Sequence, residues 1–150
     1  MTAHFESVQN AALYPDALDV AAPVSLLERD LWPRKLGLFM RHVVATGEVS
    51  DEAAVHKPLR ELAVGQFGFV PPWVKSVSDA KLRSTKLVNA RSETVTTSNN
   101  FRDAWLAGQR CIVPMMAFFE DDWRSGKAVP TRITRVDGKP MGVAGIWERW

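Results

Sequence analysis

Polar and apolar residues alternate along residues 86–95, which read KLVNARSETV. Successive side chains of a β-strand point to opposite faces, so the pattern predicts a strand. One face would carry an amide, a guanidinium and a carboxylate, those of Asn89, Arg91 and Glu93. The other face would carry only small residues. The polar face has two interpretations: a surface exposed to water, or a polar site built on a sheet.

Other segments have the apolar patterns of extended chain, namely residues 29–45, 65–71, 110–114, 129–136 and 141–147. The last two flank DGKP at 137–140, a turn signal, and therefore predict a β-hairpin. We expect polar loops at residues 46–58 and 76–86.

The clearest helical pattern lies at residues 96–110, where Ser98 or Asn99 can cap a helix and Gly108 can end it. Residues 5–19 predict a short helix broken at Pro15. Several strands and about one clear helix indicate a β-rich α+β fold, and the chain length indicates a single domain over residues 1–150.

The formal net charge is only +2, but the charges are unevenly distributed. Residues 75–110 contain seven basic and three acidic residues, whereas residues 1–30 contain one basic and five acidic residues. A local excess of positive charge suits a phosphate backbone. It is equally compatible with an ordinary solvated surface.

The single cysteine, Cys111, excludes a disulfide within one chain and reads as a small buried apolar residue. The N-terminus carries no secretory signal pattern, and no apolar run approaches the ~20 residues of a membrane span. We therefore expect a cytoplasmic protein with no membrane contact. The three histidines, His4, His42 and His56, lack metal-ligand spacing, so we expect no metal and no cofactor.

Glu120 follows the apolar residues 117–119. A carboxylate at the edge of a core can act as a general acid or base, or can simply reach water at a strand end. Trp73 lies in VPPWVK beside Lys75, where an aromatic ring next to a cation suits base stacking, although packing beneath a loop is the alternative.

Together these segments resemble the SOS-response-associated peptidase (SRAP) family of abasic-site-processing proteins. NARSET at 89–94 is similar to the family's Asn-Ala-Arg-x-Glu-Thr, and FGFVPPW at 67–73 to its Trp-Gly-Leu-Ile-Pro-x-Trp. RCIVPMMAFFE at 110–120 resembles Arg-Cys-Leu-Val-Pro-Ala-Asp-Gly-Phe-Tyr-Glu. DGKPMGVAGIWERW at 137–150 resembles Asp-Gly-x-Pro followed by Ala-Gly-Leu-Trp, and DLWP at 30–33 resembles Asn-Val-Ala-Pro.

The resemblance implies a barrel-like α+β fold with a positively charged channel for single-stranded DNA. Family members capture the aldehyde of an abasic site with the amine and thiol of an N-terminal cysteine. By the resemblance, Asn89 holds the sugar or the N-terminus, and Glu120 is the acid–base group beside the amine. Arg91 binds phosphate and Trp73 stacks on bases, and we expect Lys75 and His4 to contact DNA as well. The expected partner is abasic single-stranded DNA and the expected state is a monomer.

This chain departs from the family pattern at chemically important positions. Thr2 stands where the family has its cysteine, and the family's histidine lies beyond the segment that resembles residues 137–150. We therefore expect the fold to lack its C-terminal portion. Met116 and Ala117 replace an Asp-Gly pair, and Phe67 replaces a tryptophan.

Removal of Met1 would leave Thr2 with a free α-amine, whose ordinary pKa is ~7.7–8. An amine can form a Schiff base with an aldehyde, and the Thr2 hydroxyl could then close an oxazolidine ring. An alcohol is a weaker nucleophile than a thiolate, so we expect this ring to be reversible. A Schiff base could instead lead to strand cleavage by β-elimination.

Three hypotheses follow from the sequence. The protein senses abasic single-stranded DNA through reversible amine chemistry at Thr2; or it binds such DNA without covalent chemistry; or it is a truncated, phage-type remnant without activity. The peptidase name implies removal of the family's own N-terminal residues, and the sequence contains no independent proteolytic triad motif.

Overall fold

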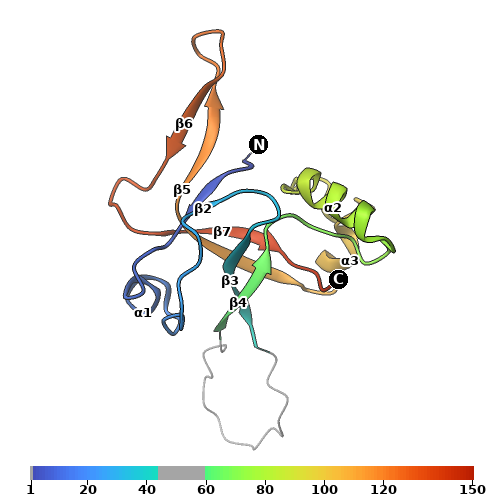
Figure 1. Cartoon of the computed structure of the whole chain (residues 1–150), viewed down its shortest axis with the longest axis horizontal. Helices are drawn as coiled ribbons and strands as arrows, with labels where there is room; N and C mark the ends of the chain where they lie inside the picture. The colour runs from blue at the N-terminus through green and yellow to red at the C-terminus, as the bar shows by residue number, and fades with distance from the viewer. Residues whose placement is uncertain (1, 44–59) are drawn as a thin grey trace, which may run out of the picture.

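The computed structural model describes residues 2–43 and 60–150. Within these ranges the chain forms a seven-stranded antiparallel sheet and three short helices, as expected for a β-rich α+β fold (Figure 1). The strands are β1 (Phe5–Ser7), β2 (Asp30–Leu31), β3 (Leu36–His42), β4 (Arg60–Gln66), β5 (Arg110–Asp122), β6 (Val129–Ile133) and β7 (Met141–Ile146). The helices are α1 (Leu13–Leu18), α2 (Val77–Lys86) and α3 (Arg102–Leu106).

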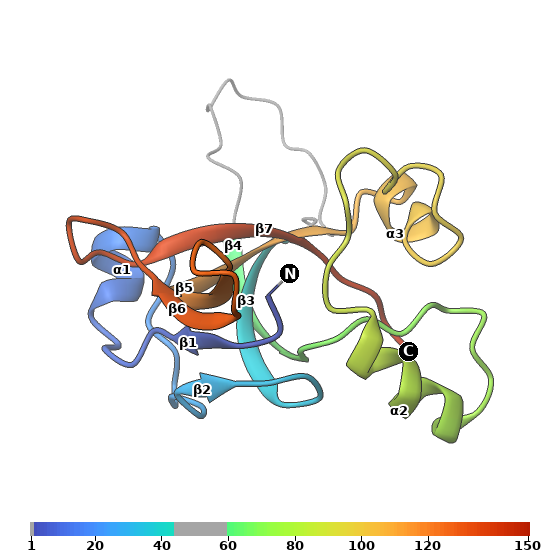
Figure 2. The same ribbon diagram turned by 90° about the horizontal axis from the view of Figure 1, so that it is seen from above.

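Strand β5 organises the sheet because it is long enough, at 13 residues, to pair with four other strands. Its first half pairs with β7 and, at Ile112, with β3. Its second half pairs with β1 on one side and β6 on the other. The two halves of the sheet therefore share β5, and Figure 2 shows β7 on one side of this strand and β1 and β2 on the other.

The predicted hairpin between residues 129–136 and 141–147 is wrong. Both segments form strands and the turn between them is present, with Gly138 at φ 70°. However, β6 pairs with residues 118–122 of β5 and β7 pairs with residues 110–115 of β5, and not with each other. The physical reason is the length of β5, which offers each segment a separate stretch of backbone donors and acceptors.

The strand predicted at residues 86–95 is also wrong, as is the loop predicted at 76–86. Residues 77–86 form α2, which the Ser76 hydroxyl caps by accepting a hydrogen bond from the Asp79 N–H at 3.1 Å. Arg83 and Asp79 form an ion pair one turn apart. A cap and an ion pair, and not an apolar stripe, stabilise this helix, which explains why hydrophobic periodicity missed it.

The helix predicted at residues 96–110 is shorter in the structure. Only Arg102–Leu106 are helical, and no side chain caps the helix, so the predicted caps Ser98 and Asn99 are wrong. Tight turns occupy residues 91–98, with the N–H of Ser98 donating to the carbonyl of Thr94 at 2.8 Å. Gly108 ends the helix as predicted, with φ 73°.

Among the other predicted segments, some agree with the structure and some do not. The extended chain predicted at 29–45 contains β2 and β3, and the strand predicted at 110–114 is the start of β5. The strand predicted at 65–71 ends at Gln66. The helix predicted at 5–19 is wrong at its start, because Phe5–Ser7 form β1 and only Leu13–Leu18 are helical. The predicted break at Pro15 is also wrong, because this residue lies in the first turn of α1, where its missing N–H costs no helical hydrogen bond. The loop predicted at 46–58 lies outside the described residues. No described helix has the length and apolarity needed to cross a membrane.

Gly68 brings the end of β4 against α2. A Cβ at this position would lie 1.9 Å from the carbonyl oxygen of Ser84, and the backbone has φ 108°. Only glycine permits this approach. Directly after it, the N–H of Phe69 donates to the carbonyl of Leu87 at 2.8 Å. This packing fixes the start of the segment that carries Asn89.

A buried carboxylate ties β1 to β6. Glu6 is 6% exposed and accepts two hydrogen bonds from Arg132, at 2.9 and 2.6 Å, while Arg29 lies 3.2 Å away. The bonds from Arg132, reinforced by Arg29, outweigh desolvation and lower the pKa of Glu6 to about 2. A depressed folded-state pKa contributes stability above the ordinary pKa of 4.5, and this stability is lost as the pH falls toward 2.

We expect Glu6→Gln to lower the free energy of unfolding at pH 7 by roughly 1–2 kcal/mol, because it removes charge-assisted hydrogen bonds of a buried carboxylate whose arginine partners are about half exposed or more and therefore screened by water. Urea unfolding at several pH values would measure this, and the difference from the unaltered protein should shrink between pH 4.5 and 2. Glu28→Gln, which removes an exposed ion pair with Lys35, is the control and should cost less than ~1 kcal/mol. Equal effects of the two substitutions would contradict the assignment.

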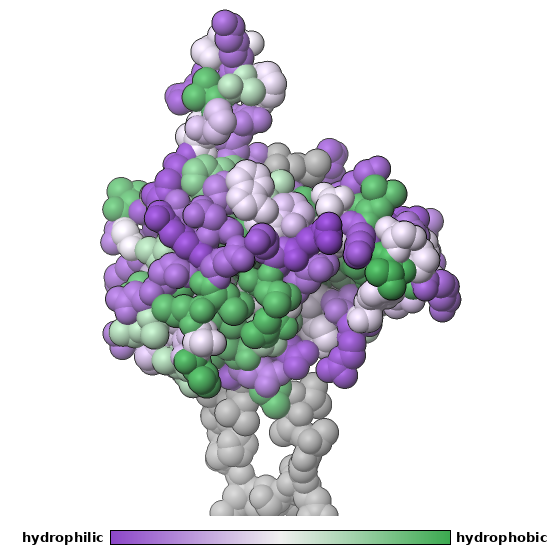
Figure 3. Space-filling model, viewed as in Figure 1, coloured by the Kyte–Doolittle hydropathy of each residue, from purple (hydrophilic) through white to green (hydrophobic). Residues whose placement is uncertain are grey.

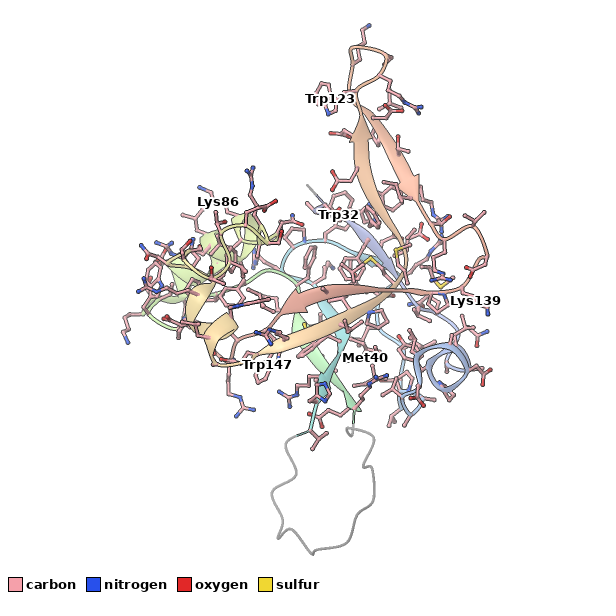
Figure 4. The ribbon with its side chains drawn as sticks, turned by 180° about the vertical axis from the view of Figure 1, so that it is seen from behind. Trp32, Met40, Lys86, Trp123, Lys139 and Trp147 are labelled. Atoms are coloured by element: carbon pink, nitrogen blue, oxygen red, sulfur yellow. The ribbon has the colours of Figure 1, made fainter. Side chains whose placement is uncertain are left out.

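Beyond β1, strands β5 and β6 continue as a two-stranded arm that projects from the body (Figures 1 and 4). Trp123 lies at the tip of this arm and is 64% exposed. Figure 3 shows apolar surface on the body below the arm, over the β3–β4 part of the sheet. The start of the chain lies between the base of the arm and α2, and the candidate site is located there.

Candidate functional site

Three residues far apart in the sequence meet at the start of the chain. The Thr2 hydroxyl donates a hydrogen bond to Oε1 of Glu120 at 2.6 Å. The side-chain amide of Asn89 donates to the backbone carbonyl of Thr2 at 2.7 Å. The hydroxyl of Thr2 is therefore held by Glu120 of β5, and its carbonyl is held by Asn89 in the segment after α2.

The pKa of Glu120 lies below its ordinary value, because the carboxylate accepts hydrogen bonds first from the chain's amino terminus and then from the Thr2 hydroxyl. These bonds outweigh the effect of burial. Glu120 is consequently ionised at neutral pH, and it presents a negative charge to any amine at residue 2. The sequence prediction that placed Glu120 beside the N-terminus agrees with this geometry.

An open cavity of about 590 Å³ adjoins these residues. Its lining consists of Asn89, Ala90, Arg91, Glu93, Thr94 and Glu120. Asn89, Arg91 and Glu93 thus gather at one cavity, as the polar-site interpretation predicted. The route differs from the predicted one: turns, and not the alternation of a strand, direct them there, and Ala90 and Thr94 are exposed at the same cavity instead of packing behind it.

A larger groove of about 950 Å³ lies beside the first cavity; Thr2 lines this groove, and Asn89 lines both. Its walls are mainly apolar side chains of β3, β4, β5 and β7, together with Phe67 and Trp147. Thr2 and Asn89 therefore lie between a polar cavity and an apolar groove. This position leaves residue 2 accessible to a ligand.

His4, which the sequence suggested as a DNA contact, is enclosed by other aromatic rings. Its ring stacks on Trp32 at a centroid distance of 4.1 Å and on Phe119 at 4.2 Å, with interplanar angles of 9° and 5°. Its Nε2 is 2.8 Å from Oδ1 of Asp30. No local sequence pattern marks Trp32, Phe119 or Asp30, because these residues converge only through the pairing of β1 with both β2 and β5.

Trp73 and Lys75, the other suggested DNA contacts, line neither cavity. The indole N–H of Trp73 donates to the carbonyl of Asn99 at 3.2 Å, and the guanidinium of Arg83 lies 4.4 Å from the ring centroid. Trp73 is nevertheless 43% exposed. It connects the turn before α2 with the segment before α3.

The described residues contain no group of three or more His, Cys, Asp and Glu side chains arranged to hold a metal ion. Cys111 is buried, and desolvation raises the pKa of its thiol to about 11. The thiol therefore stays protonated, as expected for a cysteine that packs in the core. Thr2 therefore brings a hydroxyl to the site, whereas Cys111 provides no thiolate.

The chain is similar to known proteins in sequence and in fold. The model of the SOS response associated peptidase (SRAP) family matches residues 27–150. Two abasic site processing proteins of Bacillus subtilis are similar in sequence: YoaM is 36% identical over 88 residues and YoqW is 35% identical over 86 residues, each match covering 57% of this chain. In each case the match covers 36% of the relative's own length.

A crystal structure of a protein from Bordetella bronchiseptica has the same fold over nearly the whole chain. The two structures superpose with a TM-score of 0.79 at 37% sequence identity. The match covers 99% of this chain and 64% of that one. The chain thus spans about two thirds of the length of its structural relative and about one third of the length of its Bacillus relatives.

Proposed function

The chain belongs to the SOS response associated peptidase family, and on this premise we propose that it recognises abasic sites in single-stranded DNA through reversible chemistry at Thr2. The observation that carries the proposal is the position of Thr2, whose hydroxyl bonds to Glu120 and whose carbonyl bonds to Asn89 at an accessible cavity. The names of the Bacillus relatives support the choice of an abasic site as the substrate.

The first step requires the α-amine of Thr2, which is free once Met1 has been removed. The amine nitrogen attacks the C1′ aldehyde of the ring-opened abasic sugar and forms a carbinolamine. The carbinolamine hydroxyl leaves as water, and a C1′=N Schiff base remains. Glu120 can accept the proton that the nitrogen loses and return it to the departing hydroxyl, which is the role of a general acid–base group.

The Thr2 hydroxyl provides a second, weaker bond. Its oxygen can add to the C1′ carbon of the Schiff base and close a five-membered oxazolidine that contains N, Cα, Cβ, Oγ and C1′. Glu120 already accepts a hydrogen bond from this hydroxyl at 2.6 Å and can take its proton when the ring closes. An alcohol is a poorer nucleophile than a thiolate, so ring closure and Schiff-base formation both remain reversible.

The surrounding residues supply the DNA-binding part of the proposal. Arg91 lines the cavity with Asn89 and is exposed, so its guanidinium can bind a phosphate beside the sugar. Trp73 and Lys75 lie on the same basic stretch of chain, residues 75–110 and the turn before it, and extend the binding surface around α2. His4 contributes indirectly, by stacking on the rings of Trp32 and Phe119 beside Thr2. Binding should therefore weaken steeply with salt.

One observation favours a second candidate, binding without covalent chemistry. Residue 2 carries an alcohol, so the durable ring that a thiol could form with the sugar is not available. A related outcome is strand cleavage, since a Schiff base acidifies the C2′ proton and allows the 3′ phosphate to leave by β-elimination. The three outcomes differ in what remains on the DNA.

Borohydride trapping distinguishes them. The protein is mixed with a single-stranded oligonucleotide that carries one abasic site, with and without borohydride, and the products are separated on denaturing gels. We expect a protein–DNA band only with borohydride, because hydride reduces the Schiff base to a stable secondary amine. An oligonucleotide without an abasic site is the control. Absence of the band from a folded, DNA-binding protein would leave the binding-only candidate, and a shortened oligonucleotide would indicate elimination.

A further inference from the structure

The stack of Trp32, His4 and Phe119 spans three strands and reaches the candidate site at one end. Phe5 and Glu6 of β1 lie opposite Leu31 and Asp30 of β2, which places His4 beside the residue that follows β2. On the other side, the N–H of Phe119 donates to the carbonyl of His4 at 3.1 Å. Phe119 immediately precedes Glu120, and His4 is two residues from Thr2.

Trp32 forms the outer end of this stack. One face of its indole is covered by His4, yet the residue is 51% exposed, so its other face is open to solvent. Figure 4 shows Trp32 beside the start of the chain, at the base of the β5–β6 arm. The near-parallel rings and the bond from His4 to Asp30 hold the indole in a fixed orientation. An open, preoriented aromatic face is the feature on which an unpaired base stacks.

The turn after Trp32 adds a cation at a costly backbone position. The N–H of Lys35 donates to the carbonyl of Trp32 at 3.0 Å, with Pro33 second and Arg34 third in the turn. Arg34 has φ 75°, which is the left-handed conformation that the third position of a type II turn requires and that favours glycine. Lys35 pairs with Glu28 and Arg29 with Glu6, but no described acidic side chain pairs with the exposed Arg34.

We propose that Trp32 and Arg34 form a second nucleic-acid contact, in which the indole stacks on an unpaired base near the abasic site and the guanidinium binds an adjacent phosphate. The inference rests on the proposed function, which supplies the single-stranded DNA, and it goes beyond the residues assigned there. It accounts for two features that the fold itself does not require: a half-exposed tryptophan held rigid, and an arginine where glycine would be less strained.

The test measures affinity apart from chemistry. A fluorescent single-stranded oligonucleotide carries an abasic analogue that lacks the aldehyde, and fluorescence anisotropy gives its Kd for the full chain. We expect Trp32→Ala to weaken binding roughly tenfold, the usual size of one base–aromatic stack. Trp32→Phe retains a ring and should stay within about threefold of the unaltered protein. Trp123→Ala, which removes an even more exposed indole at the arm tip, is the matched control and should have no effect.

Arg34→Gly gives an independent test that unfolding cannot imitate. Glycine adopts the left-handed conformation without strain, so the variant should unfold at the same denaturant concentration as the unaltered protein or a higher one. Its Kd should nevertheless rise several-fold, and the slope of log Kd against log salt should fall by about one, because one phosphate contact is lost. Trp32→Ala should leave that slope unchanged.

The outcomes separate this inference from the proposed function. Unchanged Kd values for Trp32→Ala and Arg34→Gly, in a protein that binds the oligonucleotide, would overturn the second contact and leave the chemistry at Thr2 intact. Weakened binding by both variants, with no borohydride-trapped band from the unaltered protein, would support the contact and overturn the chemistry. If the unaltered protein does not bind single-stranded DNA, both proposals are wrong.

Discussion

Replacement of Thr2 by cysteine is expected to produce a protein–DNA adduct that survives without borohydride. A thiol that adds to the Schiff base closes a thiazolidine, and sulfur is a far better nucleophile for this step than the threonine oxygen. The resemblance to the family leads to the same expectation, since its members carry cysteine at this position. On a denaturing gel, the unaltered protein should give a trapped band only with reductant, whereas Thr2→Cys should give one in both lanes.

Thr2→Ser is the matched control for this substitution. It keeps a hydroxyl at the same position, where Glu120 accepts the hydrogen bond in the unaltered protein at 2.6 Å. It should therefore behave like the unaltered protein and need borohydride. A stable adduct from both Thr2→Ser and the unaltered protein would show that the alcohol suffices and would contradict the reversible character assigned to Thr2.

Replacement of Glu120 by glutamine is expected to slow borohydride trapping by roughly a hundredfold, the usual contribution of one general acid–base group. Glutamine has the same shape and can still accept a hydrogen bond from the Thr2 hydroxyl through its carbonyl, but it cannot transfer the proton that leaves the amine. The rate of trapping at saturating protein would measure the effect. Binding of the aldehyde-free oligonucleotide should change much less.

Asp121→Asn provides the control for charge. Asp121 is the neighbouring carboxylate on β5, is exposed, and points to the other face of the strand. Its removal alters the net charge by the same amount as Glu120→Gln, so it should leave the trapping rate near that of the unaltered protein. If the two variants slow trapping equally, the effect is one of overall charge, and Glu120 has no special role.

The sequence predicted which residues form the site better than it predicted the backbone conformation that brings them together. Asn89, Arg91 and Glu93 were expected together because a strand would alternate them, yet turns after α2 bring them to one cavity with Glu120. The family resemblance gives residue types in their order along the chain and says nothing of the local backbone that carries them. Local periodicity reports only whether neighbouring side chains are polar, so it could not distinguish a strand from a sequence of tight turns.

Long-range contacts were beyond local reasoning for a related reason. The stack of Trp32, His4 and Phe119 depends on the pairing of β1 with β2 and of β1 with β5, and the second pairing joins Phe5 to Phe118. The ion pair of Glu6 with Arg132 depends in addition on the pairing of β5 with β6, which places Arg132 opposite Phe119. Likewise, β6 and β7 were recognised as strands, but their partner could not be inferred from the turn that joins them.

Helix α2 marks a different limit. Its apolar residues do not form a stripe, and it was therefore taken for a loop. The information was nevertheless present in Ser76 followed three residues later by Asp79, and in the spacing of Asp79 and Arg83. Weighting capping and charge spacing as heavily as hydrophobic periodicity would have found the helix, and with it the placement of Asn89 directly after its end.

The central claim is that the α-amine of Thr2, and not a lysine, bonds to the abasic sugar. The most direct test is to trap the adduct with borohydride, digest protein and DNA, and locate the modified peptide by mass spectrometry. We predict that the sugar remnant is attached to the N-terminal peptide, that Met1 is absent from it, and that fragmentation places the modification on the nitrogen of Thr2. A remnant on a lysine of residues 75–86, with the N-terminal peptide unmodified, would contradict the account.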